Sequence, residues 1–370
     1  MLFPYVYVPH PMEIMKHFLD FIFHEVWCKA PGSGPYHFAL FDDMPELKEL
    51  METFHYSDTK GADFFNGHIE RIYQIFSTLT KDQIAQLSAW YDDNNELEKT
   101  CRNDPAIATV RYSDLKAFNV GLAEQLSRFF KGLYSQNLLG LSDLKEKIGN
   151  IDDHYQAFMA QNKEGKCPFC GIHDIKGIYH SKREAYDHYL PKGIYPFNSI
   201  NFKNLAPACQ ECNSSYKLTK DPAYHPKDPL MTRTNGKRKA FYPFSSRPYK
   251  IELELQLDST DWNNIDPRDI KISFGPEVLK EQISTWEDVY GIQERYKAKC
   301  CGENDGKYWI EQILDEWRED GKTPDEFLET LHRNTMKKPF AEANFLKGPF
   351  LKACKEAGLF GHKIIPVHRS

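Results

Sequence analysis

The chain contains 370 residues, carries a formal net charge of −6, and is 41% hydrophobic and 14% aromatic. This composition excludes an intrinsically disordered protein and provides enough length for two or three domains with buried cores. The chain has no apolar stretch long enough to cross a membrane, and its start lacks the basic residues of a secretory signal. We therefore expect a cytoplasmic protein without membrane association.

The first region, residues 1–155, is predicted to be mainly helical. One helix is expected within residues 78–98. Farther along, apolar residues recur at spacings of three and four, which predicts a single amphipathic helix with Ser113 or Asp114 as its N-cap. The residues of this apolar stripe are Leu115, Phe118, Leu122, Leu126, Phe129 and Leu133.

The last region, residues 226–370, begins with a stretch rich in proline, asparagine and basic side chains. This stretch, residues 226–248, predicts a basic loop or linker. Its basic residues include Arg233, Lys237, Arg238 and Lys239. Apolar and polar residues then alternate over residues 251–257 and again over residues 270–274, which predicts two β-strands.

Helices are expected to return after the two strands. The sequence Thr323-Pro324-Asp325-Glu326 is a capping box with proline at the first helical position, and it opens a helix through Leu331. The predicted fold class is therefore α+β. We expect a helical N-terminal domain at 1–155, a central module at 156–225 and a C-terminal α+β region at 226–370.

The central module contains two pairs of cysteines with the same two-residue gap. The chain has nine cysteines, an odd number that argues against a fully paired disulfide framework. Two such pairs bring four thiolates within reach of one tetrahedral ion, and zinc fits best. The expected role is structural, because four sulfur ligands leave no open position. His173 or His180 is close enough in sequence to replace one thiolate, although both are more simply ordinary polar residues. The paired residues are Cys167, Cys170, Cys209 and Cys212.

Basic residues concentrate around this module. Residues 163–250 contain 16 Lys and Arg against 7 Asp and Glu, a local charge of +9, so the rest of the chain carries −15. A basic island in an acidic protein is typical of a polyanion site, and its simpler alternative is an excess of solvated surface charge.

Between and after the cysteine pairs lie side chains suited to metal-assisted hydrolysis. Asp187 offers a hard oxygen ligand, and the neighbouring His188 can take a proton from water near neutral pH. Asn213 follows the last cysteine and offers an amide oxygen, while Lys217 lies four residues on, on the same face of a helix. Asn204 can bond across the loop around His188 or form a simple Asx-turn. Alone, Asp187-His188 is more often an ordinary surface or core pair.

The order of these motifs resembles the HNH endonuclease family, whose fold is the ββα-metal finger. The order is CxxC, Asp-His, then Asn-Leu-x-Pro-x-CxxC-Asn-x-x-x-Lys, and the likeness covers residues 167–217 alone. It is strongest to the subgroup with DHYLPK and NLAPACQECNSSYK segments, which are residues 187–192 and 204–217 here. Such domains occur in bacterial anti-phage systems, including the HNH component of Septu-like systems, which acts beside an ATPase.

The resemblance implies a role for each matching residue. His188 would be the general base, and Asn204 would orient the loop and the histidine. Asp187 and Asn213 would bind the catalytic divalent ion. Asn213 stands where some members have a third histidine, which favours Mg²⁺ or Mn²⁺ at that position. The four cysteines would hold structural zinc, and Lys217 and Lys192 would contact the nucleic acid.

The expected function is therefore that of a metal-dependent endonuclease that hydrolyses phosphodiester bonds, with DNA favoured as the substrate. The resemblance further implies an effector of anti-phage defence that works with an ATPase or another defence protein. Three alternatives stay open. One is a zinc-ribbon module that binds nucleic acid or protein without catalysis. Another is a structural subunit in which an inactive nuclease fold docks a partner, and the third is an HNH effector that cleaves RNA such as tRNA.

Overall fold

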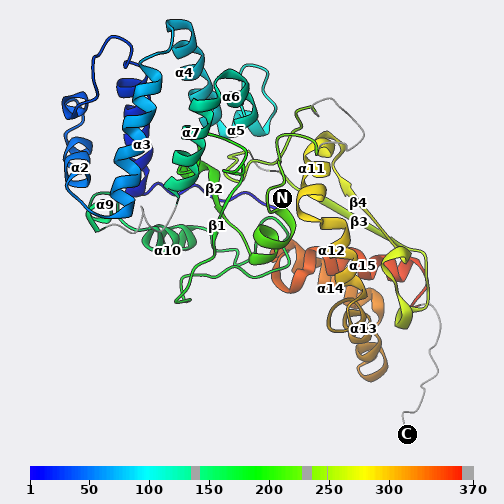
Figure 1. Ribbon diagram of the computed structural model, residues 1–370. Coiled ribbons are helices and arrows are strands. Elements are labelled where there is room, and N and C mark those ends of the chain that lie inside the picture. The colour runs from blue at the N-terminus through cyan, green and yellow to red at the C-terminus, as the bar shows by residue number, and fades with distance from the viewer. Residues whose placement is uncertain (135–141, 227–235, 248, 361–370) are drawn as a thin grey trace. The chain divides into compact units, whose positions relative to one another are not determined.

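The computed structural model describes residues 1–134, 142–226, 236–247 and 249–360. These residues form an α+β structure of many helices and two small antiparallel sheets (Figure 1). The chain divides into two compact units. The helical unit comprises the described parts of Pro4–Lys163 and Lys176–Ser246, and the hairpin unit comprises those of Met1–Phe3, Glu164–Ile175 and Arg247–Ser370. The predicted domains, residues 1–155, 156–225 and 226–370, are a separate prediction and remain one.

The N-terminal part of the helical unit is helical, as predicted. Its core is built from aromatic and aliphatic side chains; α3 packs against both α2 and α7 (Figure 1). Trp27 is buried there and donates its indole N–H to the carbonyl oxygen of Ile69 at 3.0 Å. The helices are η1 (Pro11–Glu13), α1 (Ile14–Phe21), η2 (Ile22–Trp27), η3 (Phe38–Phe41), α2 (Pro45–His55), α3 (Lys60–Phe76), α4 (Lys81–Asn95), α5 (Leu97–Cys101), α6 (Tyr112–Phe118), α7 (Val120–Leu133), α9 (Ser142–Ile148) and α10 (Ile151–Gln161).

The single helix expected along the apolar stripe is two helices, α6 and α7. The break falls at Asn119, whose backbone is extended at φ −157° and ψ 114°. Its side-chain oxygen accepts a hydrogen bond from the Leu122 amide at 3.0 Å and so caps α7. The expected N-cap was also wrong, because Arg111 occupies that position in α6. The periodicity predicted the buried face correctly but did not detect the internal cap.

The second part of the helical unit carries a strand–strand–helix arrangement. Strand β1 (Tyr186–His188) pairs antiparallel with β2 (Leu205–Pro207), with His188 opposite Leu205. The short helix η4 (Phe202–Asn204) leads into β2, and η5 (Glu211–Lys217) follows it. In η5, the Leu218 amide donates to the carbonyl oxygen of Asn213 at 3.1 Å, the five-residue spacing of a wide π-type turn.

The hairpin unit contains the two strands predicted from alternation. Strand β3 (Glu252–Leu257) pairs antiparallel with β4 (Ile270–Gly275), and Leu255 opposes Ile272. The glutamates of β3 are exposed while Leu255 is buried beneath α15. The helices of this unit are η6 (Trp262–Asn264), η7 (Pro267–Asp269), η8 (Glu277–Leu279), α11 (Lys280–Tyr290), α12 (Ile292–Cys301), η9 (Glu303–Lys307), α13 (Tyr308–Glu319), α14 (Pro324–Lys337), η10 (Ala341–Ala343) and α15 (Asn344–Glu356).

The predicted capping box is present at the start of α14. The Thr323 hydroxyl accepts from the Glu326 amide at 3.3 Å, and the Glu326 carboxylate accepts from the Thr323 amide at 2.8 Å. These reciprocal bonds satisfy two backbone donors that the first turn leaves open. The helix runs to Lys337, beyond the predicted limit at Leu331.

The predicted basic loop is only partly a charged surface. Arg233 lies outside the described residues, and Lys239 is exposed. Arg238, however, is 3% exposed and donates to the carbonyl oxygen of Asp221 at 2.6 Å. Its guanidinium therefore holds the loop to the protein instead of adding to the exposed charge.

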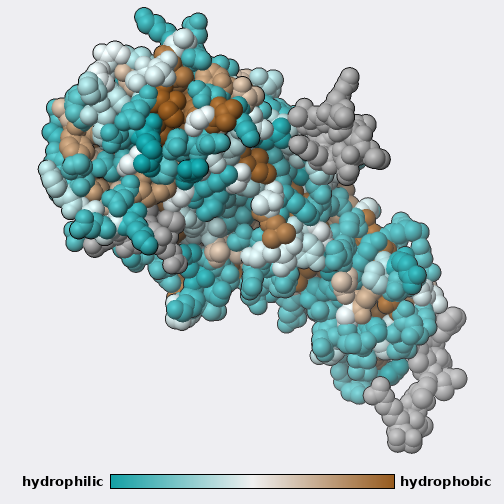
Figure 2. Space-filling view, in the orientation of Figure 1, coloured by the Kyte–Doolittle hydropathy of each residue, from teal (hydrophilic) through white to brown (hydrophobic). Residues whose placement is uncertain are grey.

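The face drawn in Figure 2 is mainly hydrophilic and interrupted by scattered hydrophobic residues. Among the helices that the structure describes, none combines the length and the apolar character that a membrane crossing requires.

Candidate metal centre and catalytic cluster

The four cysteines of the two CxxC pairs gather into one cluster. Their sulfur atoms all lie within 4.8 Å of one another, and all four residues are buried. Sulfur ligands of a tetrahedral zinc ion, at Zn–S distances of about 2.3 Å, are separated by about 3.8 Å, so the cluster fits such an ion with little adjustment. None of the nine cysteines, all of which the structure describes, forms a disulfide. His173 and His180 do not belong to the cluster. The residues that can hold zinc are Cys167, Cys170, Cys209 and Cys212.

The first cysteine pair lies on a tight turn. The Cys167 carbonyl oxygen accepts from the amides of Cys170 and Gly171, at 3.3 and 2.7 Å. Gly171 has a φ of +69°, and a Cβ atom there would lie 2.3 Å from Leu2, so this position requires glycine. Tyr296 and Trp286 further fix the turn by donating to the carbonyl oxygens of Cys170 and Phe169, at 2.8 and 2.6 Å.

The second cysteine pair leads directly into η5. The Cys212 amide donates to the sulfur of Cys209 at 3.4 Å, and the Asn213 amide donates to the Cys209 carbonyl oxygen at 3.0 Å. An N–H aimed at sulfur favours the thiolate, the form that binds metal. The position of η5, and of the side chains it carries, is therefore tied to this cysteine pair.

A buried ion pair joins η5 to β1. The ammonium of Lys217 donates to Asp187 Oδ1 at 2.9 Å and to the carbonyl oxygen of His188 at 2.8 Å. The side chains of Lys217 and Asp187 are only 1% and 4% exposed. Lys217 therefore connects the helix to both residues of the Asp-His pair.

Asp187 has an oxygen that fits a metal ligand. Its Oδ2 atom is buried and has no hydrogen-bond partner among the described residues. Burial raises the pKa of Asp187, and the charge and hydrogen bond of Lys217 oppose that rise. An orphaned carboxylate oxygen in a dry site costs free energy unless a cation or a donor satisfies it. Mg²⁺ and Mn²⁺ prefer such oxygen ligands, so the residue fits the predicted divalent ion.

His188 is held in one orientation by residues from elsewhere in the chain. Its Nε2 atom lies 2.8 Å from the carbonyl oxygen of Ser199, which can only accept, so Nε2 carries the proton. The neutral ring then has its lone pair on Nδ1. The ring of Tyr134 packs edge-to-face on the imidazole, with centroids 4.7 Å apart at 87°. Neither Ser199 nor Tyr134 was expected from sequence, because a backbone carbonyl and a distant aromatic ring carry no motif.

The imidazole of His188 is strongly biased toward its neutral form. Burial, followed by the charge of Lys192, lowers its pKa from 6.5 to about 3, although the Ser199 hydrogen bond acts in the opposite direction. The neutral form is the one that can accept a proton as a general base, and a pKa this low makes the imidazole a weaker base than an unperturbed histidine.

Asn204 bridges the loop that follows β1. Its Oδ1 atom accepts from the Leu190 amide at 2.8 Å, and its Nδ2 atom donates to the Leu190 carbonyl oxygen at 3.0 Å. A second contact runs from Nδ2 to Asn198 Oδ1 at 3.3 Å. The Asn204 side chain is fully buried. Its amide therefore acts as a structural bridge to Leu190, two residues after His188. It does not reach solvent, where a substrate would lie.

The two lysines predicted to contact nucleic acid are placed differently. Lys217 is buried in its ion pair, whereas Lys192 is partly exposed. The Lys192 ammonium lies 5.2 Å from the ring centroid of Tyr134, and burial lowers its pKa. The charges of both lysines act on His188, and because Lys192 is the more exposed of the two, it is the better placed to meet a phosphate beside the imidazole.

Asn213 is partly exposed and lies four residues before Lys217 in η5. Residues at this spacing share a face of a helix, and Lys217 on that face reaches Asp187.

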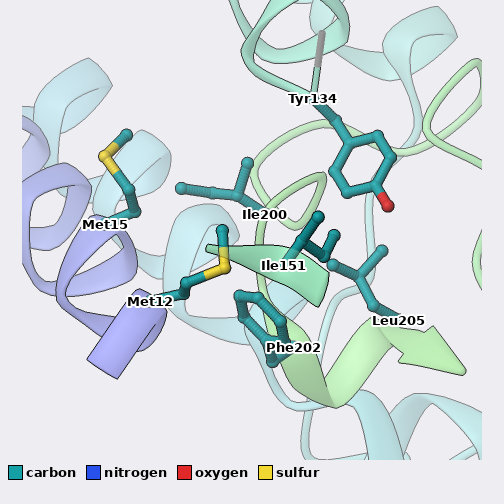
Figure 3. Close-up of a pocket in the computed structure, with 7 residues that line it drawn as sticks. All are labelled: Met12, Met15, Tyr134, Ile151, Ile200, Phe202 and Leu205. Carbon is teal, nitrogen blue, oxygen red and sulfur yellow. The ribbon is translucent and has the colours of Figure 1, made fainter. Parts of the chain in front are cut away.

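An apolar pocket lies next to this cluster (Figure 3). Two of its lining residues contact His188: the ring of Tyr134 packs on the imidazole, and Leu205 pairs with His188 across the sheet. Among the residues that the structure describes, the lining is apolar apart from the Tyr134 hydroxyl. The lining residues are Met12, Met15, Tyr134, Ile151, Ile200, Phe202 and Leu205.

Comparison with known proteins identifies no family. No family model matches the chain, and no solved structure matches it. Among curated proteins, the chain is 35% identical over 77 residues to protein ea31 of Escherichia phage lambda. The match covers 20% of this chain and 23% of that protein, so the chain spans under a quarter of its relative's length.

Proposed function

We propose that this chain is a metal-dependent endonuclease of the HNH type that hydrolyses phosphodiester bonds, with DNA favoured as the substrate. The observation that carries the proposal is the pairing of two features on β1. Asp187 offers a buried carboxylate oxygen that has no hydrogen-bond partner within the part of the chain that the structure describes, and the adjacent His188 is a neutral imidazole with its proton fixed on Nε2. The strand–strand–helix arrangement of β1, β2 and η5 supports it, because the predicted ββα finger has this order.

Each residue of the cluster has a distinct task in this proposal. Nδ1 of His188 accepts a proton from the attacking water, a contribution of about 10²–10⁴-fold in rate. The Ser199 carbonyl oxygen and the Tyr134 ring keep the imidazole in the orientation that this transfer requires. Asp187 and Asn213 would hold the divalent ion, which would supply positive charge to stabilise the negative charge that grows on the phosphate. The ammonium of Lys192 adds positive charge beside the imidazole.

The four-cysteine cluster serves as a scaffold in this proposal. Zinc on four thiolates has no open position for a substrate. Its effect is to fix the start of η5, and with it Asn213 and Lys217, against β1.

A role in anti-phage defence, with an ATPase or another defence protein as partner, is part of the proposal. It is supported by the resemblance of residues 167–217 and by the negative charge of the remaining chain. A charge of −15 outside the basic island suits a protein partner better than DNA.

The test is cleavage by the purified chain and by its His188→Ala variant. Supercoiled plasmid, single-stranded DNA and tRNA are each incubated with Mg²⁺, with Mn²⁺ and with a chelator. We expect cleavage that requires the metal and falls by about 10²-fold or more in the variant. His37→Ala, at an exposed histidine of the same unit, is the matched control. An unchanged rate in His188→Ala refutes the assignment, cleavage of tRNA alone indicates an RNA-cleaving effector, and metal-independent binding without cleavage indicates a zinc-ribbon binding module.

A further inference from the structure

The loop between the first cysteine pair and β1 displays an aromatic ring to solvent. Tyr179 is 95% exposed and Ile178 is 45% exposed. Together they form the tip of this loop. Burial in the core accounts for neither side chain.

A tight turn holds this tip in place. The His180 amide donates to the Gly177 carbonyl oxygen at 3.0 Å, which closes a four-residue turn with Ile178 and Tyr179 at its two central positions. The Gly177 amide donates in return to Nδ1 of His180, also at 3.0 Å. Both bonds are made by the first and last residues, so the two central side chains are free to project outward.

The base of the loop is anchored to the rest of the helical unit. The ammonium of Lys176 lies 3.2 Å from Glu184 Oε1, and the guanidinium of Arg183 donates to Asp152 of α10 at 2.8 Å. The Tyr155 hydroxyl donates to the Lys176 carbonyl oxygen. Three residues after Arg183 the chain enters β1. The turn is therefore a fixed projection that precedes the Asp-His strand.

The charge of the loop suits a polyanion. Residues 176–185 contain three basic side chains and one acidic side chain, a net charge of +2 with neutral histidine. Lys182 is exposed beside the tip. Two apolar side chains are too few for the area of about 800 Å² per partner that a stable protein interface buries. An exposed aromatic ring next to positive charge is instead the arrangement that stacks on a nucleobase while a lysine meets the backbone.

We infer that the turn Gly177–His180 is a nucleic-acid contact, in which the Tyr179 ring stacks on an unpaired base of the substrate and Lys182 contacts a phosphate. The inference rests on the proposed function for the choice of ligand. It adds a requirement for an unpaired or unstacked base, because the faces of paired bases within a duplex are covered by their neighbours.

Binding is measured in the His188→Ala background, so that cleavage does not interfere. Fluorescence anisotropy with labelled single-stranded DNA, single-stranded RNA and a fully paired DNA duplex provides three dissociation constants. We expect Tyr179→Ala to weaken binding of a single strand about tenfold and to affect the duplex less. Tyr179→Phe keeps the ring and should bind within about twofold of the parent. Comparison of the two single-stranded probes shows whether DNA or RNA supplies the base that stacks on Tyr179.

Tyr56→Ala is the matched control, since Tyr56 is 85% exposed on another part of the helical unit. It should leave all three constants unchanged, and circular dichroism should show both alanine variants to be folded. Single-strand affinity within twofold of the parent in Tyr179→Ala overturns the inference, as does an equal loss on the duplex.

The two proposals fail separately. If the wild type cleaves but Tyr179→Ala binds normally, the endonuclease stands and the contact does not. If nothing is cleaved but binding depends on Tyr179, the contact stands and the catalytic assignment does not.

Discussion

The ion pair between Lys217 and Asp187 is the contact in the cluster whose loss should be most costly. Replacing Lys217 with methionine keeps the length of the side chain and removes its charge. Asp187, 4% exposed, would keep its negative charge and lose the neighbouring ammonium. Breaking a buried pair on one side costs about 3–5 kcal/mol, because the remaining charge stays desolvated and uncompensated. We expect Lys217→Met to lower the free energy of unfolding by about this amount.

The assay is urea unfolding followed by circular dichroism, for the wild type, Lys217→Met and the double variant Lys217→Met/Asp187→Asn. The double variant has no buried charge at this site, so it should regain about 2 kcal/mol or more relative to Lys217→Met. Lys203→Met, at an exposed lysine two residues before β2, is the control and should change stability by less than about 0.5 kcal/mol.

Two outcomes would refute the reasoning. A loss below about 1 kcal/mol in Lys217→Met would mean that the pair is not buried and coupled as described. Failure of the double variant to recover would mean that the loss comes from packing and not from the charge of Asp187. If Lys217→Met does not fold at all, recovery of a folded protein in the double variant supplies the same information.

Two further predictions concern the metal cluster and the pH dependence of stability. We expect one zinc ion per chain by elemental analysis, and Cys209→Ser should lose zinc and melt at lower temperature, whereas Cys28→Ser, outside the cluster, should keep it. Burial lowers the pKa of His154 to about 4, so as the pH falls below about 6.5 the unfolded state binds this proton before the folded state does. His154 alone should leave the free energy of unfolding full at pH 8 and lower it by about 2 kcal/mol at pH 5. His154→Gln should remove this part of the dependence of stability on pH, whereas the control His37→Gln should leave it in place. Full zinc content in Cys209→Ser would contradict the prediction about the metal cluster. The same dependence of stability on pH in the wild type and in His154→Gln would contradict the prediction about His154.

Local patterns were sufficient where a single element determines the outcome. The Thr323 capping box and the alternation in β3 were predicted from a few adjacent residues and are present. The apolar stripe identified the buried face of α6 and α7 but not the break at Asn119, because an asparagine within a helical pattern is ambiguous until its side chain finds a backbone donor. Arg238 was expected to add to a basic surface and is instead buried, since its partner is a backbone carbonyl that no charge count detects.

The sequence by itself determined the chemistry available to this protein. Equal spacing of two cysteine pairs identified four thiols that gather into one cluster able to hold a metal such as zinc, and the order of Asp187, His188 and Asn213 between and after them identified the candidate catalytic set. Tertiary structure alone decided how those side chains are used. It turned Lys217 toward Asp187 and placed Tyr134 and the Ser199 carbonyl oxygen around His188, and it left Asp187 Oδ2 with no hydrogen-bond partner among the described residues. The physical reason is that burial and pairing depend on residues far apart in the chain, whereas a motif records only which groups are present.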